Sequence, residues 1–261
     1  MPQPTESGFP VLTEELRKKM GESAVNGAKG IGYVGAGTFE FLLDKDHHFY
    51  FLEVNTRLQV EHPVTEQVYG VDLVKAQIEV AAGLPVPWQQ EQLVPRGHSF
   101  ECRITCEDPE RNFLPSPGTV EKLTLPQGPG VRVDTMLYPG YQVSGAFDSM
   151  VAKLITYGAD REQARTRMIL ALQEMRLVGI PTSIPFHLQV LEHPEFIAGN
   201  LSTHFLADYS PKFKPSAPDE KEAALVALMA ASLGQNTSVA TNASQSSDLW
   251  KLSARTELLR R

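Results

Sequence analysis

The chain has 261 residues, of which 42% are hydrophobic and 21% charged, and its formal net charge is −7. This composition is typical of a globular protein, and the acidic balance argues against nucleic-acid binding, which needs a basic face. No apolar run reaches the roughly 20 residues that span a bilayer, and the N-terminus lacks a signal-peptide core. Cys102 and Cys106 have no second pair to complete a zinc site, so we expect buried, reduced thiols.

The first predicted elements are a helix and a β-hairpin. The helix covers residues 11–29 and starts at Thr13-Glu14-Glu15. A glycine-rich turn over residues 30–37 leads into "TFEFLLDKDHHFYFLEV", two β-rich runs around a polar turn, which predicts the hairpin. Residues 64–83 then show a helical pattern, with Val74, Ile78 and Ala81 as its apolar positions.

The pattern of predicted elements changes after the proline-rich stretch "GLPVPWQQEQLVPRG", which looks like a domain boundary. Short β-rich runs separated by Pro-Gly turns predict a compact antiparallel sheet or barrel. They are "HSFECRITCED", "GTVEKLTL", "GVRVDTMLY", "YQVSG" and "MVAKLITYG". A helix follows, with a capping box from Asp160 and Gln163. Its predicted buried stripe consists of Ala164, Met168, Ala171 and Met175.

The last predicted elements are a short helix and a polar tail. The helix covers residues 183–191. Beyond Ser210, "SPKFKPSAPDE" reads as a linker, "KEAALVALMAAS" as an isolated helix and "GQNTSVATNASQSSD" as low-complexity sequence.

The hairpin places two carboxylates opposite each other. A four-residue loop over residues 45–48 predicts three pairs on one face: Glu40–Glu53, Thr38–Asn55 and Leu42–Phe51. The other face is then apolar and suits a core, with Phe39, Phe41, Leu43, Tyr50, Leu52 and Val54. Like charges directly opposite each other are unfavourable by about 0.2–1 kcal/mol, and a divalent cation between them reverses the sign. From the hairpin alone, a metal site and a solvated face are equal interpretations.

The continuation of the second strand, "FLEVNTRLQVEHPVTE", favours the metal site. In an extended chain Phe51, Glu53, Asn55, Arg57, Gln59 and Glu61 all point to one side. His62 precedes Pro63, which is expected to keep the row straight as far as Glu61. The guanidinium of Arg57 suits a planar oxyanion such as bicarbonate, and Glu61, close to that cation, is a candidate general base.

These strings resemble a known enzyme family. "GAGTFEFLL" followed by "FYFLEVNTRLQVEHPVTE" is similar to the biotin carboxylase component of biotin-dependent carboxylases, and the resemblance covers roughly residues 12–209. "RGHSFECRITCEDPERNFLPSPGTV" and "GAFDSMVAKLITYG" look like the C-terminal domain of that family. The resemblance implies an ATP-dependent ligase that carboxylates biotin through carboxyphosphate.

The resemblance implies roles for individual residues. Glu40 and Glu53 match the carboxylates that hold Mg²⁺ (or Mn²⁺) on ATP, assisted by Asn55. Arg57 matches the bicarbonate-binding arginine, with Gln59 and the Val60 backbone beside it, and Glu61 matches the general base.

Four further positions follow from the resemblance. Arg132 matches the arginine that stabilises the biotin enolate. Leu42 and Ile180 match the lining of the adenine pocket, although either could equally be core. Asp148 matches a residue on the active-site side to which we assign no role.

The resemblance also implies an α+β fold in three segments. Residues 1–95 are expected to form the C-terminal part of an ATP-grasp domain, an antiparallel sheet with helices. Residues 96–210 are expected to form the biotin carboxylase C-terminal domain, a small mixed β-sheet or barrel with helices. Residues 211–261 would be a linker or tail.

The expected partners follow from what the sequence does not contain. The N-terminal biotin carboxylase half and a biotin-attachment motif are absent, so we expect the chain alone to be inactive. Its partners would be that half, a biotin carboxyl carrier, a carboxyltransferase and, as a further assembly, a second copy in a homodimer, with no nucleic acid or membrane. We expect a cytoplasmic location, or the mitochondrial matrix in a eukaryote. The acyl acceptor is chosen by another domain.

Two other functions stay open at this point. The chain could be a non-catalytic assembly fragment of a carboxylase. It could also be an ATP-grasp ligase for another carboxylate substrate, although the string from Arg57 to Glu66 speaks against that alternative.

Overall fold

The computed structural model describes residues 4–8, 11–209 and the single residues Ala224 and Leu228. Contacts divide the chain into two compact units, Met1–Phe213 and Lys214–Arg261. The described residues lie almost entirely in the first unit, and the predicted tail lies outside them except for Ala224 and Leu228. The predicted division near residue 95 falls inside the first unit and stays a prediction.

The first unit contains seven α-helices and twelve strands among its described residues. The helices are α1 (Glu14–Gly30), α2 (His62–Tyr69), α3 (Leu73–Ala81), α4 (Arg161–Glu174), α5 (Ile184–Glu192), α6 (Pro194–Ala198) and α7 (Phe205–Tyr209). The strands are β1 (Thr5–Glu6), β2 (Thr38–Leu43), β3 (Phe49–Asn55), β4 (His98–Thr105), β5 (Glu107–Asp108), β6 (Leu114–Pro115), β7 (Gly118–Thr119), β8 (Lys122–Thr124), β9 (Val131–Thr135), β10 (Gln142–Val143), β11 (Met150–Gly158) and β12 (Arg176–Val178). No described helix has both the length and the apolar character that a bilayer crossing requires.

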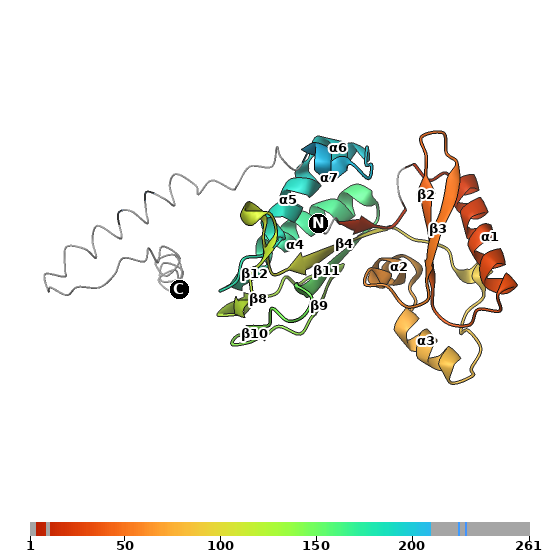
Figure 1. Ribbon diagram of the computed structural model, residues 1–261, viewed down its shortest axis with the longest axis horizontal. Helices are drawn as coiled ribbons and strands as arrows, with labels where there is room; N and C mark the ends of the chain where they lie inside the picture. Colours follow the sequence, from red (N-terminus) through yellow and green to blue (C-terminus); the bar gives the residue numbers. More distant parts are fainter. Residues whose placement is uncertain (1–3, 9–10, 210–223, 225–227, 229–261) are drawn as a thin grey trace, which may run out of the picture. The chain divides into compact units, whose positions relative to one another are not determined.

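The predicted antiparallel sheet is present in the second half of the unit. Its four strands follow the order β1-β4-β11-β9, and every neighbouring pair is antiparallel (Figure 1). Three two-stranded ladders surround it: β5 with β6, β7 with β10, and β8 with β12. The long strands β4 and β11 pair along their whole length and form the centre of the sheet.

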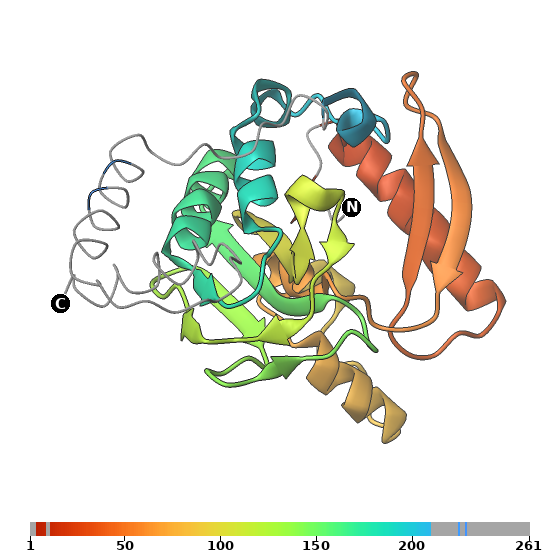
Figure 2. The same cartoon turned by 60° about the vertical axis from the view of Figure 1, so that its left-hand side comes forward.

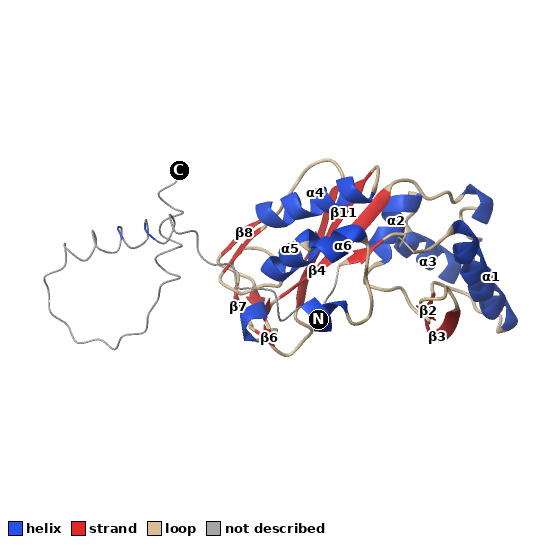
Figure 3. Ribbon diagram, turned by 90° about the horizontal axis from the view of Figure 1, so that it is seen from above, coloured by secondary structure: helices blue, strands red, loops and turns tan. Residues whose placement is uncertain are grey.

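The sheet has two faces of different chemistry, because successive side chains of a strand point to opposite sides. We call the first the apolar face: Phe100, Cys102 and Ile104 on β4, Leu154 on β11, and Val133 on β9. The helices α4 and α5 cover it (Figure 3). We call the second the charged face: Glu101 and Arg103 on β4, Lys153 on β11, and Arg132 and Asp134 on β9. The helix α2 contacts this part of the sheet.

The helix α4 starts at Asp160 and buries the predicted stripe. The Asp160 carboxylate accepts a hydrogen bond from the backbone N–H of Gln163 at 2.8 Å. The Gln163 side-chain oxygen accepts a hydrogen bond from the backbone N–H of Ala159 instead of from that of Asp160. The predicted capping box is therefore only half formed. Gly158 at the end of β11 allows α4 to pack close to the strand, since a Cβ at this position would lie 2.4 Å from the backbone nitrogen of Ala164. The stripe is confirmed: Ala164, Met168, Ala171 and Met175 are all buried.

In the first half of the unit, α1 runs along the β2–β3 hairpin (Figure 2). The Thr13 hydroxyl accepts from the Leu16 N–H and starts the helix as predicted. The ring of Phe39 lies directly over Gly27, where an added Cβ would be 3.1 Å from it. Arg17 donates to the Tyr69 hydroxyl at 2.8 Å, which connects α1 to α2.

The hairpin pairs as predicted only near its open end. Glu40 faces Glu53 and Thr38 faces Asn55, which confirms those two pairs. The predicted Leu42–Phe51 pair is wrong, because a bulge at Leu52 places Phe51 opposite Phe41, and the loop has five residues, 44–48. The physical gain is aromatic packing, since the Phe51 ring lies 6.1 Å from Phe41 and 6.3 Å from Phe39.

Two further predictions are wrong. The predicted core face of the hairpin is not buried throughout, because Tyr50 and Leu52 are 56% and 53% exposed. The predicted helix over residues 64–83 is two helices, broken at Gly70, whose φ of 67° is left-handed. Asp72 starts α3 by accepting from the Lys75 N–H, and the short helix buries Ala76 and leaves Val74 and Ile78 exposed.

Candidate functional site

The two carboxylates of the hairpin share one asparagine. Asn55 Nδ2 donates to Glu40 Oε1 at 2.7 Å and lies 3.4 Å from Glu53 Oε1. Because one nitrogen reaches both groups, the two carboxylates are on the same face, as the register predicts. Gln59 Nε2 donates to the same Glu40 oxygen at 2.8 Å and adds a second amide to the group. We call Glu40, Glu53, Asn55 and Gln59 the hairpin cluster.

The predicted straight row ends at Asn55, where β3 ends. Phe51 lies on the opposite face because of the bulge, and residues 56–61 are not a strand. Glu61 has φ −81° and ψ 7° and precedes the first turn of α2, which contains Pro63. The proline therefore starts a helix instead of extending the chain, as its fixed φ favours. Gln59 reaches Glu40 because the chain folds back toward the hairpin, not because the row is straight.

The loop before α2 contains one exposed cation and one carbonyl that is fixed to the sheet. The exposed Arg57 guanidinium donates to the Leu58 carbonyl at 3.2 Å and forms no ion pair among the described residues. Most of its N–H groups are therefore available to an anion. The Val60 carbonyl is held by Lys153 Nζ at 3.1 Å, which fixes the loop to β11.

Glu61, the predicted general base, forms an ion pair with Arg103 of β4. Arg103 Nη2 on β4 donates to Glu61 Oε2 at 2.6 Å, and the two side chains are 36% and 29% exposed. The pair is accessible to a substrate and fixed by the sheet at the same time.

Arg132 is held by two carboxylates on the charged face. Its guanidinium donates to both oxygens of Asp134, at 2.8 and 2.9 Å, and to Glu66 of α2 at 2.7 Å. The hydrogen bonds to Asp134, and then those to Glu66, raise the pKa of Arg132, so it is always charged. Glu66 also accepts from the Leu73 N–H, which ties α3 to the same point.

The other predicted residues lie further from these contacts. Leu42 is two residues from Glu40 along β2, on the same face, and is 51% exposed. Ile180 is 6% exposed in the core cluster, where its methyl group meets Gly118. This position agrees with the alternative of a plain core residue. Asp148 is exposed in the turn before β11, where its carboxylate accepts from the Met150 N–H.

The hairpin cluster has the donor set of a magnesium site. Two carboxylates and an amide oxygen are hard ligands of the kind that Mg²⁺ takes, with nucleotide phosphates as its other ligands. No group of three His, Cys, Asp or Glu among the described residues could hold a metal ion by itself. The Asn55 amide would have to turn its oxygen toward the ion.

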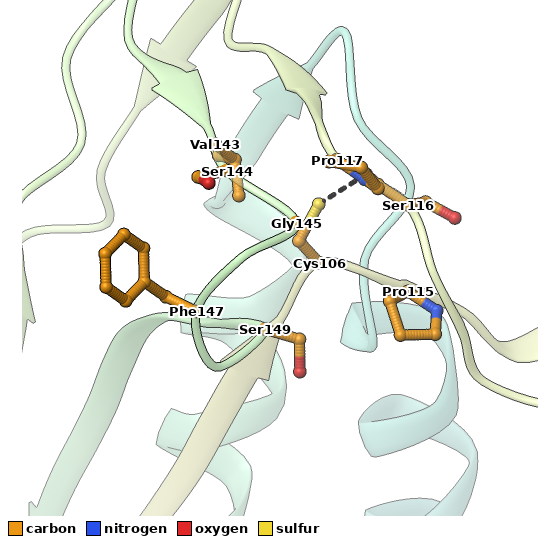
Figure 4. A pocket seen from close by; sticks show the side chains of 9 residues that line it. All are labelled: Cys106, Pro115, Ser116, Pro117, Val143, Ser144, Gly145, Phe147 and Ser149. Carbon is orange, nitrogen blue, oxygen red and sulfur yellow. Dashed lines mark hydrogen bonds between the residues drawn. The ribbon is translucent and has the colours of Figure 1, made fainter.

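Both cysteines are buried and free, as predicted. Cys106 borders a cavity of about 120 Å³ beside Phe147, and its thiol donates to the Ser116 carbonyl (Figure 4). None of the residues that line this cavity is charged, so it lacks the cation that the bicarbonate assignment of Arg57 rests on. The Cys106 thiol therefore acts as a structural hydrogen-bond donor to the Ser116 carbonyl.

The structure adds residues that the sequence reasoning missed: Glu66, Glu101, Arg103, Asp134 and Lys153. The missed signal is the alternation in "FECRIT". Two charged residues two apart in a strand otherwise made for a core indicate that its second face meets other charges.

Comparison with known proteins identifies both halves of the first unit. Residues 5–89 match the model of the carbamoyl-phosphate synthase L chain ATP-binding domain, and residues 101–208 match that of the biotin carboxylase C-terminal domain. The structure is similar to a biotin carboxylase complex with β,γ-ATP from Campylobacter jejuni, with TM-score 0.76 and 47% identity over 79% of this chain and 46% of that one. It is also similar to the biotin carboxylase domain of Hydrogenobacter thermophilus 2-oxoglutarate carboxylase, crystallised with MgADP, ADP and bicarbonate. That match has TM-score 0.80 and 40% identity over 82% and 48% of the two chains.

Sequence similarity to curated relatives agrees with the structural match. Biotin carboxylase 1 of Bacillus subtilis is 51% identical over 205 residues, which are 78% of this chain and 46% of that protein. The chain thus spans less than half the length of the relatives that it matches. The chain belongs to the biotin carboxylase family.

Proposed function

We propose that this chain forms the metal- and bicarbonate-binding side of a biotin carboxylase active site. The complete enzyme would use MgATP and bicarbonate to carboxylate biotin on a carrier protein. The observation that carries the proposal is the contact of Gln59 with Glu40, because it joins the hairpin cluster to the loop of Arg57 and Glu61. Phosphoryl transfer needs donors around the triphosphate as well as metal, so the 261 residues alone are expected to be inactive.

Glu40, Glu53 and Asn55 would hold Mg²⁺ or Mn²⁺ on ATP. The ion supplies positive charge to the phosphate oxygens. The MgADP of the Hydrogenobacter thermophilus structure supports this assignment for the family. Leu42, on the same face as Glu40, would contact the adenine, whereas the buried position of Ile180 favours a role in the core.

Arg57, Gln59 and the Val60 backbone would bind bicarbonate. Arg57 can donate two parallel hydrogen bonds to a planar oxyanion. Glu61 would take the proton of bicarbonate, and the resulting oxyanion would attack the γ-phosphorus as ADP leaves. The product, carboxyphosphate, breaks its C–O bond and gives CO₂ and phosphate.

The phosphate released from carboxyphosphate would take the N–H proton of biotin, and Arg132 would stabilise the resulting biotin enolate while the biotin nitrogen adds to CO₂. Its two carboxylate partners hold the guanidinium in place before biotin arrives, so no reorganisation is needed at that moment.

The partners proposed for the complete enzyme are the N-terminal biotin carboxylase half, a biotin carboxyl carrier and a carboxyltransferase. A homodimer is proposed as a further assembly, and the Hydrogenobacter thermophilus domain is a dimer. The proposed location is the cytoplasm or, in a eukaryote, the mitochondrial matrix.

The test is Glu61→Gln in a complete enzyme that contains this chain. Removing a general base lowers the rate by about 10²–10⁴-fold, so bicarbonate-dependent phosphate release should fall by that factor. ATP binding should persist, because Glu61 is not part of the hairpin cluster. Glu91→Gln, at an exposed position, is the matched control and should leave the rate unchanged. An equal loss of ATP affinity and rate in Glu61→Gln would show a structural role and contradict the proposal.

A further inference from the structure

The end of β4 that carries Arg103 is paired less completely than the start of the strand. Among the described residues, β1 pairs with β4 only opposite Phe100 and Glu101. On the other edge of β4, the register of β11 shifts between the partners of Ile104 and Thr105. Buried backbone groups need hydrogen-bond partners, so the carbonyl and N–H groups at this end of β4 must be satisfied by another element.

The helix α5 supplies those partners from the core side of the sheet. His187 Nε2 donates to the Arg103 carbonyl at 2.8 Å, and Ser183 Oγ is a second donor to it at 3.3 Å. Thr105 is held by both of its backbone groups: its N–H donates to Ser183 Oγ at 3.0 Å, and its carbonyl accepts from the Ser183 N–H at 3.1 Å. The start of α5 thus takes the place of a neighbouring strand.

His187 is a neutral donor. It is 0% exposed, and because Nε2 donates to a carbonyl, the ring proton lies on Nε2. Its Nδ1 is buried and has no hydrogen-bond partner among the described residues. A second proton on Nδ1 would bury a charge, and burial lowers the pKa of His187 from 6.5 to about 4. The imidazole therefore holds the Arg103 peptide without adding a positive charge beside the guanidinium.

The peptide that His187 holds belongs to the residue that pairs with the proposed base. Arg103 Nη2 donates to Glu61 Oε2 at 2.6 Å. The carbonyl carbon of Arg103 is bonded to the Cα that carries the side chain, so a shift of this carbonyl also moves the guanidinium. A chain of contacts therefore runs from α5 on the apolar side, through the backbone of β4, to Glu61 on the charged face.

We propose that His187 is a positioning residue of the active site, which holds the Arg103 peptide from the core side so that the guanidinium meets Glu61. Ser183 is the second donor of the same arrangement. The inference rests on the proposed role of Glu61 as the base. Arg103 belongs to the site already described, whereas His187 is buried and acts only through the backbone of β4. Misplacing a reacting group by about 1 Å costs about 10²-fold in rate, which sets the size of the expected effect.

The catalytic test uses variants of His187 in the complete enzyme. His187→Leu removes the donor and should lower kcat for bicarbonate-dependent ATP cleavage by about 10–10²-fold. The KM for ATP should stay unchanged, because the hairpin cluster is not touched. His187→Gln, whose amide nitrogen can take the place of Nε2, should restore most of kcat, whereas the shorter His187→Asn should not. Val190→Ala is the matched control: Val190 is 1% exposed on the same helix, so the variant loses core contacts and should keep kcat.

The geometric part is tested on the 261-residue chain without activity. The chain is labelled with ¹⁵N at histidine and arginine side chains and studied by NMR, with Arg103→Lys used for assignment. The His187 ring should carry its proton on Nε2 and should not titrate above about pH 5. The Arg103 side-chain signals should shift in Glu61→Gln and in His187→Leu, and stay in place in Val190→Ala. A proton on Nδ1 of His187, or Arg103 signals that ignore His187→Leu, would overturn the inference.

The outcomes separate this inference from the proposed function. If Glu61→Gln slows the reaction but His187→Leu, folded by circular dichroism, keeps its kcat, the positioning role is wrong and the function stands. If Glu61→Gln leaves the rate unchanged, the proposed function is wrong. Equal losses of kcat in His187→Leu and Val190→Ala would show a general loss of stability and would also contradict the inference.

A milder variant keeps the test valid if His187→Leu does not fold. Ser183→Ala removes the weaker donor to the Arg103 carbonyl and the side-chain partner of the Thr105 N–H. It should lower kcat by less than the loss expected for His187→Leu and again leave KM for ATP unchanged. A kcat equal to that of the wild type would then overturn the inference.

Discussion

The two faces of the four-stranded sheet are built from the same strands and do different work. On the apolar face, Phe100, Ile104 and Leu154 are 0% exposed beneath α4 and α5. On the charged face, Arg103, Arg132 and Lys153 each hold a carboxylate or carbonyl from another strand or from the loop and helix at α2. The strands β4, β9 and β11 thus each contribute apolar residues to one face and charged residues to the other.

The contrast between the two faces indicates that the apolar face supplies most of the stability and the charged face supplies the chemistry. Apolar burial yields free energy in proportion to area and has no directional demand. Partly exposed ion pairs yield little net free energy but fix directions. Since a slip of one residue would exchange the faces, burial of the apolar face also sets the register that aligns the charged face.

The largest expected effect comes from breaking the apolar face. Leu154→Ala leaves a cavity beneath α4 and should lower the free energy of unfolding by about 2–5 kcal/mol. Chemical denaturation of the chain measures it. Leu170→Ala, at a leucine of α4 that is 55% exposed, is the control and should stay within about 0.5 kcal/mol of the wild type. Equal losses in the two variants would refute the assignment of the core to this face.

A second prediction concerns the one acid buried on the charged face. Glu101 has a pKa raised from 4.5 to about 7 by burial, so the folded state binds its proton more tightly than the unfolded state. Its stabilising contribution is complete below pH 4.5 and is lost as the pH rises to about 7. The free energy of unfolding of the wild type, minus that of Glu101→Gln, should therefore fall by about 3 kcal/mol across this window.

Taking the difference between the two proteins is necessary because another buried group opposes Glu101. His187, on the apolar side, donates to the Arg103 carbonyl, and burial lowers its pKa from 6.5 to about 4. Its contribution is complete above pH 6.5 and is lost as the pH falls toward 4. Denaturation at several pH values, with the exposed Glu174→Gln as control, isolates Glu101. A difference that does not change with pH would show that Glu101 is ionised throughout.

The sequence predicts the apolar face better than the site, and the two differ in the range of the interactions that decide them. The alternation in β4 and β11 and the stripe of α4 are local patterns, and burial follows from them directly. The Arg103–Glu61 and Arg132–Glu66 pairs join residues 42 and 66 positions apart. No local period reports such pairs, so the resemblance to a family found Glu61 and Arg132 without their partners.

The wrong predictions have local causes as well. Alternation along β3 could not reveal the bulge at Leu52, because aromatic contacts of Phe51 decide it. Pro63 was taken to extend the chain before it, yet proline is equally suited to the first turn of a helix. Gly70 and Asp72 are a stop and a start signal in sequence, and the apolar period that continues across them hid the break between α2 and α3.

The smallest expected effect comes from Lys153, which is next to Leu154 in sequence but lies on the opposite face of the sheet. Lys153 precedes Leu154 on β11 but points to the charged face, 3.4 Å from Asp134 and 3.1 Å from the Val60 carbonyl. Lys153→Met keeps most of the side-chain volume, and Asp134 retains both hydrogen bonds from Arg132. We therefore expect Lys153→Met to lower the free energy of unfolding by no more than about 1 kcal/mol, against about 2–5 for its neighbour. In the complete enzyme the same variant should still slow bicarbonate-dependent ATP cleavage, because the Val60 backbone is no longer fixed. A loss of stability as large as that of Leu154→Ala would show that the charged face also holds the fold together.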